Sequence, residues 1–177
     1  MKKIEMVDLK GQYKEIEQEI QKSLNQVLHS TQFIKGPDVS EFERDLEKYL
    51  GVNNAIACGS GTDALQIALM SLELNPGEEI ITTDFTFAAT IEVILLLGLK
   101  PILVDIDPKT FNIDPNKVKE ALTKKTKAII PVHLFGQISN MDEILNIAKE
   151  NKLFIIEDNA QSMGSTYTFL NGEKKKA

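Results

Sequence analysis

Short runs of consecutive apolar residues alternate with segments of helical periodicity from residue 51 onward, and this alternation restricts the chain to few folds. A strand that is apolar at every position, and not only at alternate ones, fits a parallel sheet with helices on both faces. Right-handed crossovers in such a sheet bring the carboxyl ends of its strands to one edge, where ligands bind. The sequence therefore predicts a three-layer α/β fold. Its predicted strands are 55–58, 79–83, 101–105, 128–132 and 153–157, and its predicted helices are 62–72, 88–97, 115–122 and 141–151.

The first 50 residues carry helical periodicity and no strand pattern. Apolar residues recur at helical spacing over 12–30, and a second helix is expected between Asp38 and Gly51. We therefore divide the chain into an N-terminal helical segment, residues 1–50, and a sheet-containing large domain, residues 51–177. Residues 164–177 resemble a turn between strands, so we expect this domain to be incomplete at its C-terminus.

Composition excludes several classes of protein. The net charge is −6 and no basic stripe is present, so no nucleic-acid partner is expected. The longest apolar stretch, 91–99, is too short to span a bilayer, and no signal peptide is apparent at the start, so no membrane partner is expected. One cysteine fits a reducing compartment, which predicts a cytoplasmic protein. The chain has only two histidines in addition to this cysteine, which is too few for a closed Cys/His zinc site. No metal is therefore expected.

A phosphate-binding turn is predicted where the first strand gives way to a helix. The segment 58–65, CGSGTDAL, places small residues at this junction. Free N–H groups at a helix start, together with the hydroxyls of Ser60 and Thr62, suit a phosphate. An ordinary capped turn between strand and helix explains the same residues.

The same glycines also fit a dinucleotide fingerprint. Gly59, Gly61 and Ala64 have the spacing G-x-G-x-x-A, and Asp84 lies about 20 residues further on. This pattern indicates an NAD-dependent dehydrogenase as an alternative. The segment predicts a phosphate more strongly than it predicts the molecule that carries the phosphate.

Aromatic and acidic residues follow two other predicted strands. Phe85 and Phe87 come after the strand at 79–83, where an aromatic ring either lies on a heteroaromatic ligand or belongs to the core. Asp158 follows the predicted strand at 153–157, which ends on Glu157. A carboxylate there is either a helix cap or the partner of a cationic ring nitrogen, whose pKa it would raise by about 1–3 units.

Four motifs in this order resemble the DegT/DnrJ/EryC1/StrS family: SGTDAL at 60–65, FTFAAT at 85–90, PVHLFG at 131–136 and EDNAQ at 157–161. The segments VDLKGQY at 7–13 and FIKGP at 33–37 resemble the start of that family. The resemblance covers nearly the whole chain. It implies the large domain of the aspartate-aminotransferase fold, known as fold type I, with pyridoxal phosphate as cofactor.

The resemblance also implies substrates, partners and site residues. The substrates are a nucleotide-linked keto-sugar and glutamate, which donates the amino group, and the enzyme is a homodimer whose sites draw on both subunits. Asp158 pairs with the ring nitrogen of the cofactor and is the catalytic residue. The other cofactor-binding residues hold the phosphate (Gly61, Thr62, Asp63), stack on the ring (Phe87) or hydrogen-bond the ring hydroxyl (Gln161).

The lysine that binds the cofactor covalently in this family has no counterpart here. Its Ser-Phe…Lys segment is not found, and Lys174, Lys175 and Lys176 lie in a polar run that does not match it. We therefore expect the chain alone to be inactive and to lack the small C-terminal domain. A non-catalytic fragment is a further alternative. The identity of the sugar, the carbon that is aminated and a dehydratase variant are left open.

Overall fold

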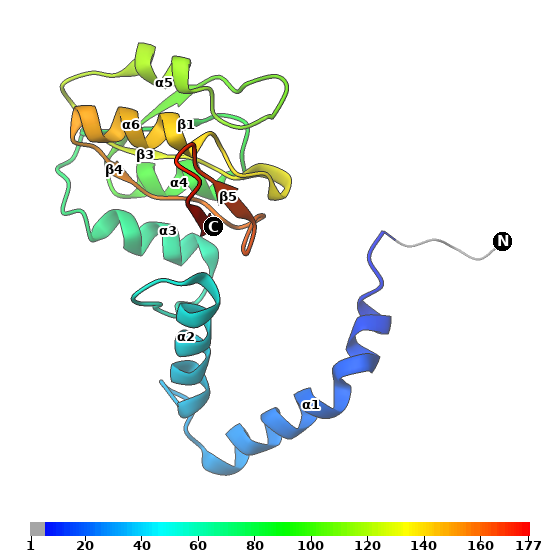
Figure 1. The fold of residues 1–177 in the computed structure, drawn as a ribbon. Coiled ribbons are helices and arrows are strands. Elements are labelled where there is room, and N and C mark those ends of the chain that lie inside the picture. The colour runs from blue at the N-terminus through cyan, green and yellow to red at the C-terminus, as the bar shows by residue number, and fades with distance from the viewer. Residues whose placement is uncertain (1–5) are drawn as a thin grey trace. The chain divides into compact units, whose positions relative to one another are not determined.

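The computed structural model describes residues 6–177 (Figure 1). The chain divides into two compact units, Met1–Leu46 and Glu47–Ala177. The proposed division at residue 50 stays a prediction.

The N-terminal unit is helical, as predicted. Helix α1 (Leu9–Ser30) is capped by Asp8, whose carboxylate accepts the Gly11 N–H at 2.9 Å, and it ends at Thr31 in the left-handed conformation. Helix α2 (Pro37–Leu50) begins with a proline, whose fixed φ suits a first helical residue, and extends into the second unit. No residue of either helix's apolar stripe is buried. Within residues 6–177, no helix combines the length and apolarity that crossing a membrane requires.

The second unit is built on a four-stranded parallel sheet, which confirms the predicted fold class. Its strands are β1 (Glu79–Thr83), β2 (Lys100–Val104), β3 (Thr126–Ile130) and β4 (Phe154–Ile155), in the spatial order β2-β1-β3-β4. Strand β1 is buried along its whole length between β2 and β3. All four strands therefore end at the same edge.

Helices cover both faces of this sheet (Figure 1). Ile80 of β1 packs in the cluster formed with α3 (Gly61–Met70) and α4 (Ala89–Leu96). The next residue, Ile81, packs in the cluster formed with α5 (Pro115–Ala121) and α6 (Met141–Asn151). Successive side chains of a strand point to opposite faces, so continuous apolarity is what a sheet with two covered faces needs.

Two sequence predictions about strands need correction. Residues 55–58 form no strand, although their apolar run predicts one, and Ile56 is 81% exposed. An apolar run becomes a strand only where a neighbouring strand pairs with its backbone, and none of the described strands does so there. The run predicted at 153–157 forms only the two residues of β4, followed by a single bridge from Asp158 to Val132. The predicted turn after Gly164 is a hairpin of β5 (Thr166–Thr168) and β6 (Lys174–Lys176).

Helix α4 allows a direct test of this layering. Ile94 is fully buried against the sheet, whereas Leu96, on the same helix, is 72% exposed. We expect Ile94→Ala to lower the free energy of unfolding by about 2–5 kcal/mol, because it removes buried methyl groups and leaves a cavity. Leu96→Ala should change it by less than about 0.5 kcal/mol. Urea denaturation of both variants measures the difference, and equal losses would contradict the layer assignment.

Candidate functional site

A cavity of about 630 Å³ lies where the strands end, beside the start of α3. Its lining includes residues that follow β1, β3 and β4 in the chain, which is where a parallel sheet places a ligand. Five of the six predicted site residues line it, namely Gly61, Thr62, Phe87, Asp158 and Gln161. Asp63 does not.

The start of α3 presents unpaired N–H groups to this cavity. Ser60 caps the helix: its Oγ accepts the Asp63 N–H at 3.1 Å and donates to the Asp63 carboxylate at 2.9 Å. The Ala64 N–H donates to the Ser60 carbonyl at 3.0 Å. Within residues 6–177, the N–H groups of Gly61 and Thr62 have no acceptor. A Cβ at Gly61 would meet no atom within 4 Å, so there is open space for an anion beside these donors.

Asp158 is held in place through both its backbone and its side chain. Its N–H donates to the Pro131 carbonyl at 2.9 Å, and its carbonyl accepts the His133 N–H at 3.1 Å. One carboxylate oxygen accepts the Thr90 hydroxyl at 2.8 Å, and the other accepts the Ala160 N–H at 3.2 Å. The side chain is 8% exposed, and it forms one wall of the cavity.

Gln161 and Phe87 complete the lining that the sequence predicted. The Gln161 side-chain carbonyl accepts the Phe135 N–H at 2.7 Å. This hydrogen bond fixes the amide so that its NH₂ group remains available as a donor. Phe135 itself has φ 56°, in the left-handed region, within a short 3₁₀ turn, Leu134–Gly136. The Phe87 ring is 74% exposed, so its surface is free to contact a ligand.

His133 and Glu157 form a pair that the sequence does not reveal. The Nδ1 of buried His133 accepts the Ser139 N–H at 3.2 Å, and a backbone amide can only donate. The ring proton therefore lies on Nε2, which is 2.8 Å from the Glu157 carboxylate and donates to it. This pair joins the segments that follow β3 and β4. His133 has a structural role, which is the more common role for a lone histidine at a strand end.

The charges around the cavity limit how it could bind an anion. Its lining includes the carboxylates of Glu157 and Asp158 and, among the described residues, no lysine, arginine or histidine. A phosphate at this site would therefore depend on the main-chain N–H groups of Gly61 and Thr62 and on the helix dipole.

The structural context of a dinucleotide-binding fingerprint is missing. That fingerprint requires a strand that leads directly into the glycine-rich turn. Residues 55–58 are not a strand, and Asp84 is exposed and does not line the cavity. A Cβ at Gly59 would lie 2.7 Å from the Asp63 carboxylate, so the nearest group is a side chain of this capped turn.

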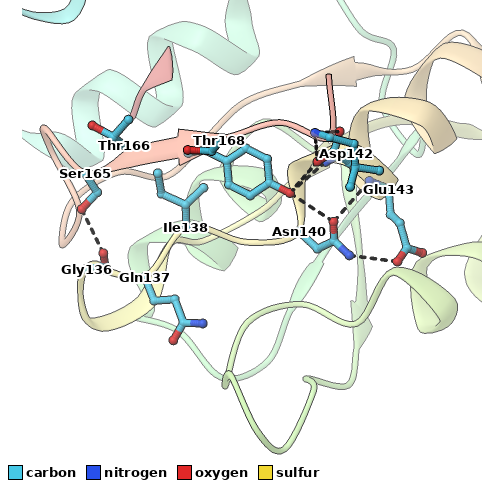
Figure 2. A pocket seen from close by; sticks show the side chains of 11 residues that line it. Gly136, Gln137, Ile138, Asn140, Asp142, Glu143, Ser165, Thr166 and Thr168 are labelled. Atoms are coloured by element: carbon cyan, nitrogen blue, oxygen red, sulfur yellow. Dashed lines mark hydrogen bonds between the residues drawn. The ribbon is translucent and has the colours of Figure 1, made fainter. Parts of the chain in front are cut away.

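A second cavity, of about 680 Å³, lies between the hairpin and the start of α6 (Figure 2). Four of its polar side chains form one hydrogen-bonded network. Tyr167 donates to the Asp142 carboxylate at 2.9 Å, and Asn140, which caps α6, donates to Glu143 at 2.8 Å. Burial raises the pKa of Tyr167 above its ordinary value, so its hydroxyl remains a donor at neutral pH. The hydrogen bonds of Tyr167 and Leu170 to Asp142 fasten the hairpin to α6.

The three consecutive lysines lie away from the first cavity. They form β6, where Lys175 pairs with Glu173 at 3.3 Å. The Lys176 ammonium lies 3.7 Å from the centre of the Tyr49 ring and donates to the Tyr49 carbonyl at 2.7 Å. None of the three lines the first cavity.

The comparisons with known proteins agree with these motifs. The model of the DegT/DnrJ/EryC1/StrS aminotransferase family matches residues 14–174. The chain is 49% identical to the pleiotropic regulatory protein of Geobacillus stearothermophilus, over 93% of this chain and 44% of that protein. It is 48% identical to the UDP-2-acetamido-2-deoxy-3-oxo-D-glucuronate aminotransferase of Pseudomonas aeruginosa, over 93% of this chain and 46% of that protein.

A solved structure extends the agreement to the fold. The chain superimposes on ntda from Bacillus subtilis, solved with its bound cofactor pmp, with a TM-score of 0.81 and 46% identity, over 83% of this chain and 34% of that one. The chain thus spans less than half the length of these relatives. Its fold is that of fold type I aminotransferases, as predicted. The chain belongs to the DegT/DnrJ/EryC1/StrS aminotransferase family.

Proposed function

We propose that the natural polypeptide carrying this sequence is a pyridoxal phosphate-dependent aminotransferase, which transfers an amino group from glutamate to a keto-sugar linked to a nucleotide. One observation carries the proposal. A single cavity combines unpaired N–H groups at a helix start with a buried, anchored carboxylate. A ligand with a phosphate and a basic ring nitrogen matches both features. The sugar aminotransferase relative supports the substrate class.

The lining residues fit pyridoxal phosphate group by group. The N–H groups of Gly61 and Thr62 would hold the phosphate, and the Phe87 ring would stack on the pyridine. Asp158 would accept a hydrogen bond from the protonated ring nitrogen, and the free NH₂ of Gln161 would donate to the ring hydroxyl. Asp63 would act through Ser60, by fixing the turn that presents the two N–H groups.

Asp158 is the residue on which the chemistry would depend. When bound, pyridoxal phosphate supplies an electron sink for the carbon that loses or gains a proton. The sink works best with a protonated ring nitrogen, and an opposite charge at hydrogen-bond distance raises the pKa of that nitrogen by about 1–3 units. A buried carboxylate fixed by two hydrogen bonds is well suited to this role.

We further propose a cytoplasmic homodimer and a large domain over residues 51–177. Large apolar side chains beside the cavity, Phe87 and Phe135, are 74% and 72% exposed, and the apolar stripe of α1 is uncovered. Surfaces of this kind favour association with a second subunit.

Calorimetric titration of the natural polypeptide tests the cofactor. We expect it to bind pyridoxal phosphate at least about tenfold more tightly than pyridoxal, because charge-assisted hydrogen bonds to a phosphate contribute about 1.5–3 kcal/mol. NADH should not bind. Tight NADH binding that is lost in Asp84→Ala, without binding of pyridoxal phosphate, would overturn the proposal. Mass spectrometry of keto-sugar nucleotides incubated with enzyme and glutamate tests the reaction.

A further inference from the structure

Thr90 is fully buried in the first turn of α4. A threonine side chain in or near a helix can hydrogen-bond a nearby backbone group. Here the Thr90 hydroxyl donates to the Asp158 carboxylate at 2.8 Å, across 68 residues of sequence. The sequence motif contains Thr90, but nothing in it indicates this partner.

A second hydroxyl fixes the direction of this hydrogen bond. Thr86, which lines the cavity, has its Oγ1 3.1 Å from the Oγ1 of Thr90. A hydroxyl has one proton to donate, and that of Thr90 goes to the carboxylate. Thr86 must therefore be the donor to Thr90. The result is a directed chain from Thr86 to Thr90 to Asp158.

The terminal side-chain torsion of Asp158 does not by itself fix the plane of the carboxylate, so hydrogen bonds from other residues must do so. The terminal torsion of an aspartate is broad and has no sharp preference. Here one oxygen is held by Thr90 on α4 and the other by the Ala160 N–H. Two donors from separate segments fix the plane of the carboxylate, and each oxygen keeps a lone pair for a further donor.

We infer that Thr90, held by Thr86, is a positioning residue that fixes the rotation of the Asp158 carboxylate toward a cationic ring nitrogen in the cavity. This inference rests on the proposed function. Thr90 itself touches neither cofactor nor substrate and acts through Asp158.

Variants at two buried threonines distinguish an effect on the orientation of the Asp158 carboxylate from a general loss of protein stability. Thr90→Val removes the hydroxyl and keeps the shape, whereas Thr90→Ser keeps the hydroxyl. Thr82→Val is the matched control: Thr82 is equally buried, its hydroxyl donates to the Ile130 carbonyl at 2.9 Å, and it does not line the cavity. Both valine variants remove one buried hydroxyl, so both should lower the melting temperature by a few degrees.

The expected results differ for the cofactor. In the natural polypeptide loaded with pyridoxal phosphate, Thr90→Val should lower kcat by about tenfold or more, with KM within about twofold, and should alter the absorption spectrum of the bound cofactor. Thr90→Ser should restore both, and Thr82→Val should change neither. A normal spectrum and kcat in Thr90→Val, or equal changes in Thr82→Val, would overturn the inference.

A crystal structure of cofactor-free Thr90→Val gives a readout that does not depend on the proposed function. It should show the Asp158 carboxylate rotated from its orientation in the unaltered protein. An unchanged carboxylate overturns the inference even if the cofactor binds as expected. If the unaltered protein binds no pyridoxal phosphate, the proposed function fails instead, so the two failures are distinguishable.

Discussion

Asp158→Asn is expected to slow transamination by the natural polypeptide about 10- to 1,000-fold while pyridoxal phosphate stays bound. Asparagine has the same size, and its carbonyl can accept the Thr90 hydroxyl, but it has no charge to keep a ring nitrogen protonated. A loss of about 1–3 pKa units on that nitrogen corresponds to about 1.4–4 kcal/mol, which sets the range. Because the substitution leaves the N–H groups of Gly61 and Thr62 unchanged, which are the proposed phosphate donors, affinity should change much less than rate.

Single-turnover kinetics with glutamate measure this effect directly. Asp84→Asn is the matched control, because it makes the same chemical change just beyond the end of β1, at an exposed residue outside the cavity. It should leave the rate within about twofold. Turnover close to normal in Asp158→Asn would remove this carboxylate from the mechanism.

Gly61→Asp is expected to abolish most phosphate affinity without unfolding the protein. A Cβ at this position meets no atom within 4 Å, and an acidic residue in the first turn stabilises a helix by about 0.3–1 kcal/mol. The same charge repels a bound phosphate. Two negative unit charges about 4 Å apart repel each other by about 4 kcal/mol at an effective dielectric constant near 20. Even one third of this repulsion would weaken phosphate binding about tenfold.

Stability and affinity should therefore change in opposite directions. Thermal unfolding and titration with pyridoxal phosphate measure the two effects on the same sample. Asn116→Asp, in the first turn of α5, adds the same charge away from the cavity and controls for the change in net charge. If Gly61→Asp binds the cofactor normally, the phosphate is not held at the start of α3.

The sequence predicts well the elements whose ends carry local signals. Helix α6 begins and ends where it is predicted, because Asn140 caps its start and Lys152 adopts a left-handed conformation just past its end. Strand β1 is likewise found over 79–83, where the apolar pair Ile80 and Ile81 is followed by two β-branched threonines. In both cases the information lies within a few residues of the element itself.

The features that the sequence analysis predicted wrongly or did not predict depend on residues that are far apart in the sequence. The run at 55–58 has strand composition, but a strand also needs a paired neighbour, and composition does not report one. Five of the six residues that motif resemblance assigns to the cofactor line one cavity, and their roles stay predictions. The bonds from Thr90 to Asp158 and from His133 to Glu157 join residues 68 and 24 positions apart, and no spacing rule connects them.

The two unpaired N–H groups at the start of α3 have a consequence for how this site is inherited. They belong to the main chain, so every amino acid except proline provides them. The features that must be conserved are therefore the path of the backbone and the open space beside it. Such a contact has no signature residue of its own. If the turn binds a phosphate as proposed, other side chains along it can be exchanged without loss of the donors, whereas an acidic substitution at Gly61 would block the site without disturbing the fold.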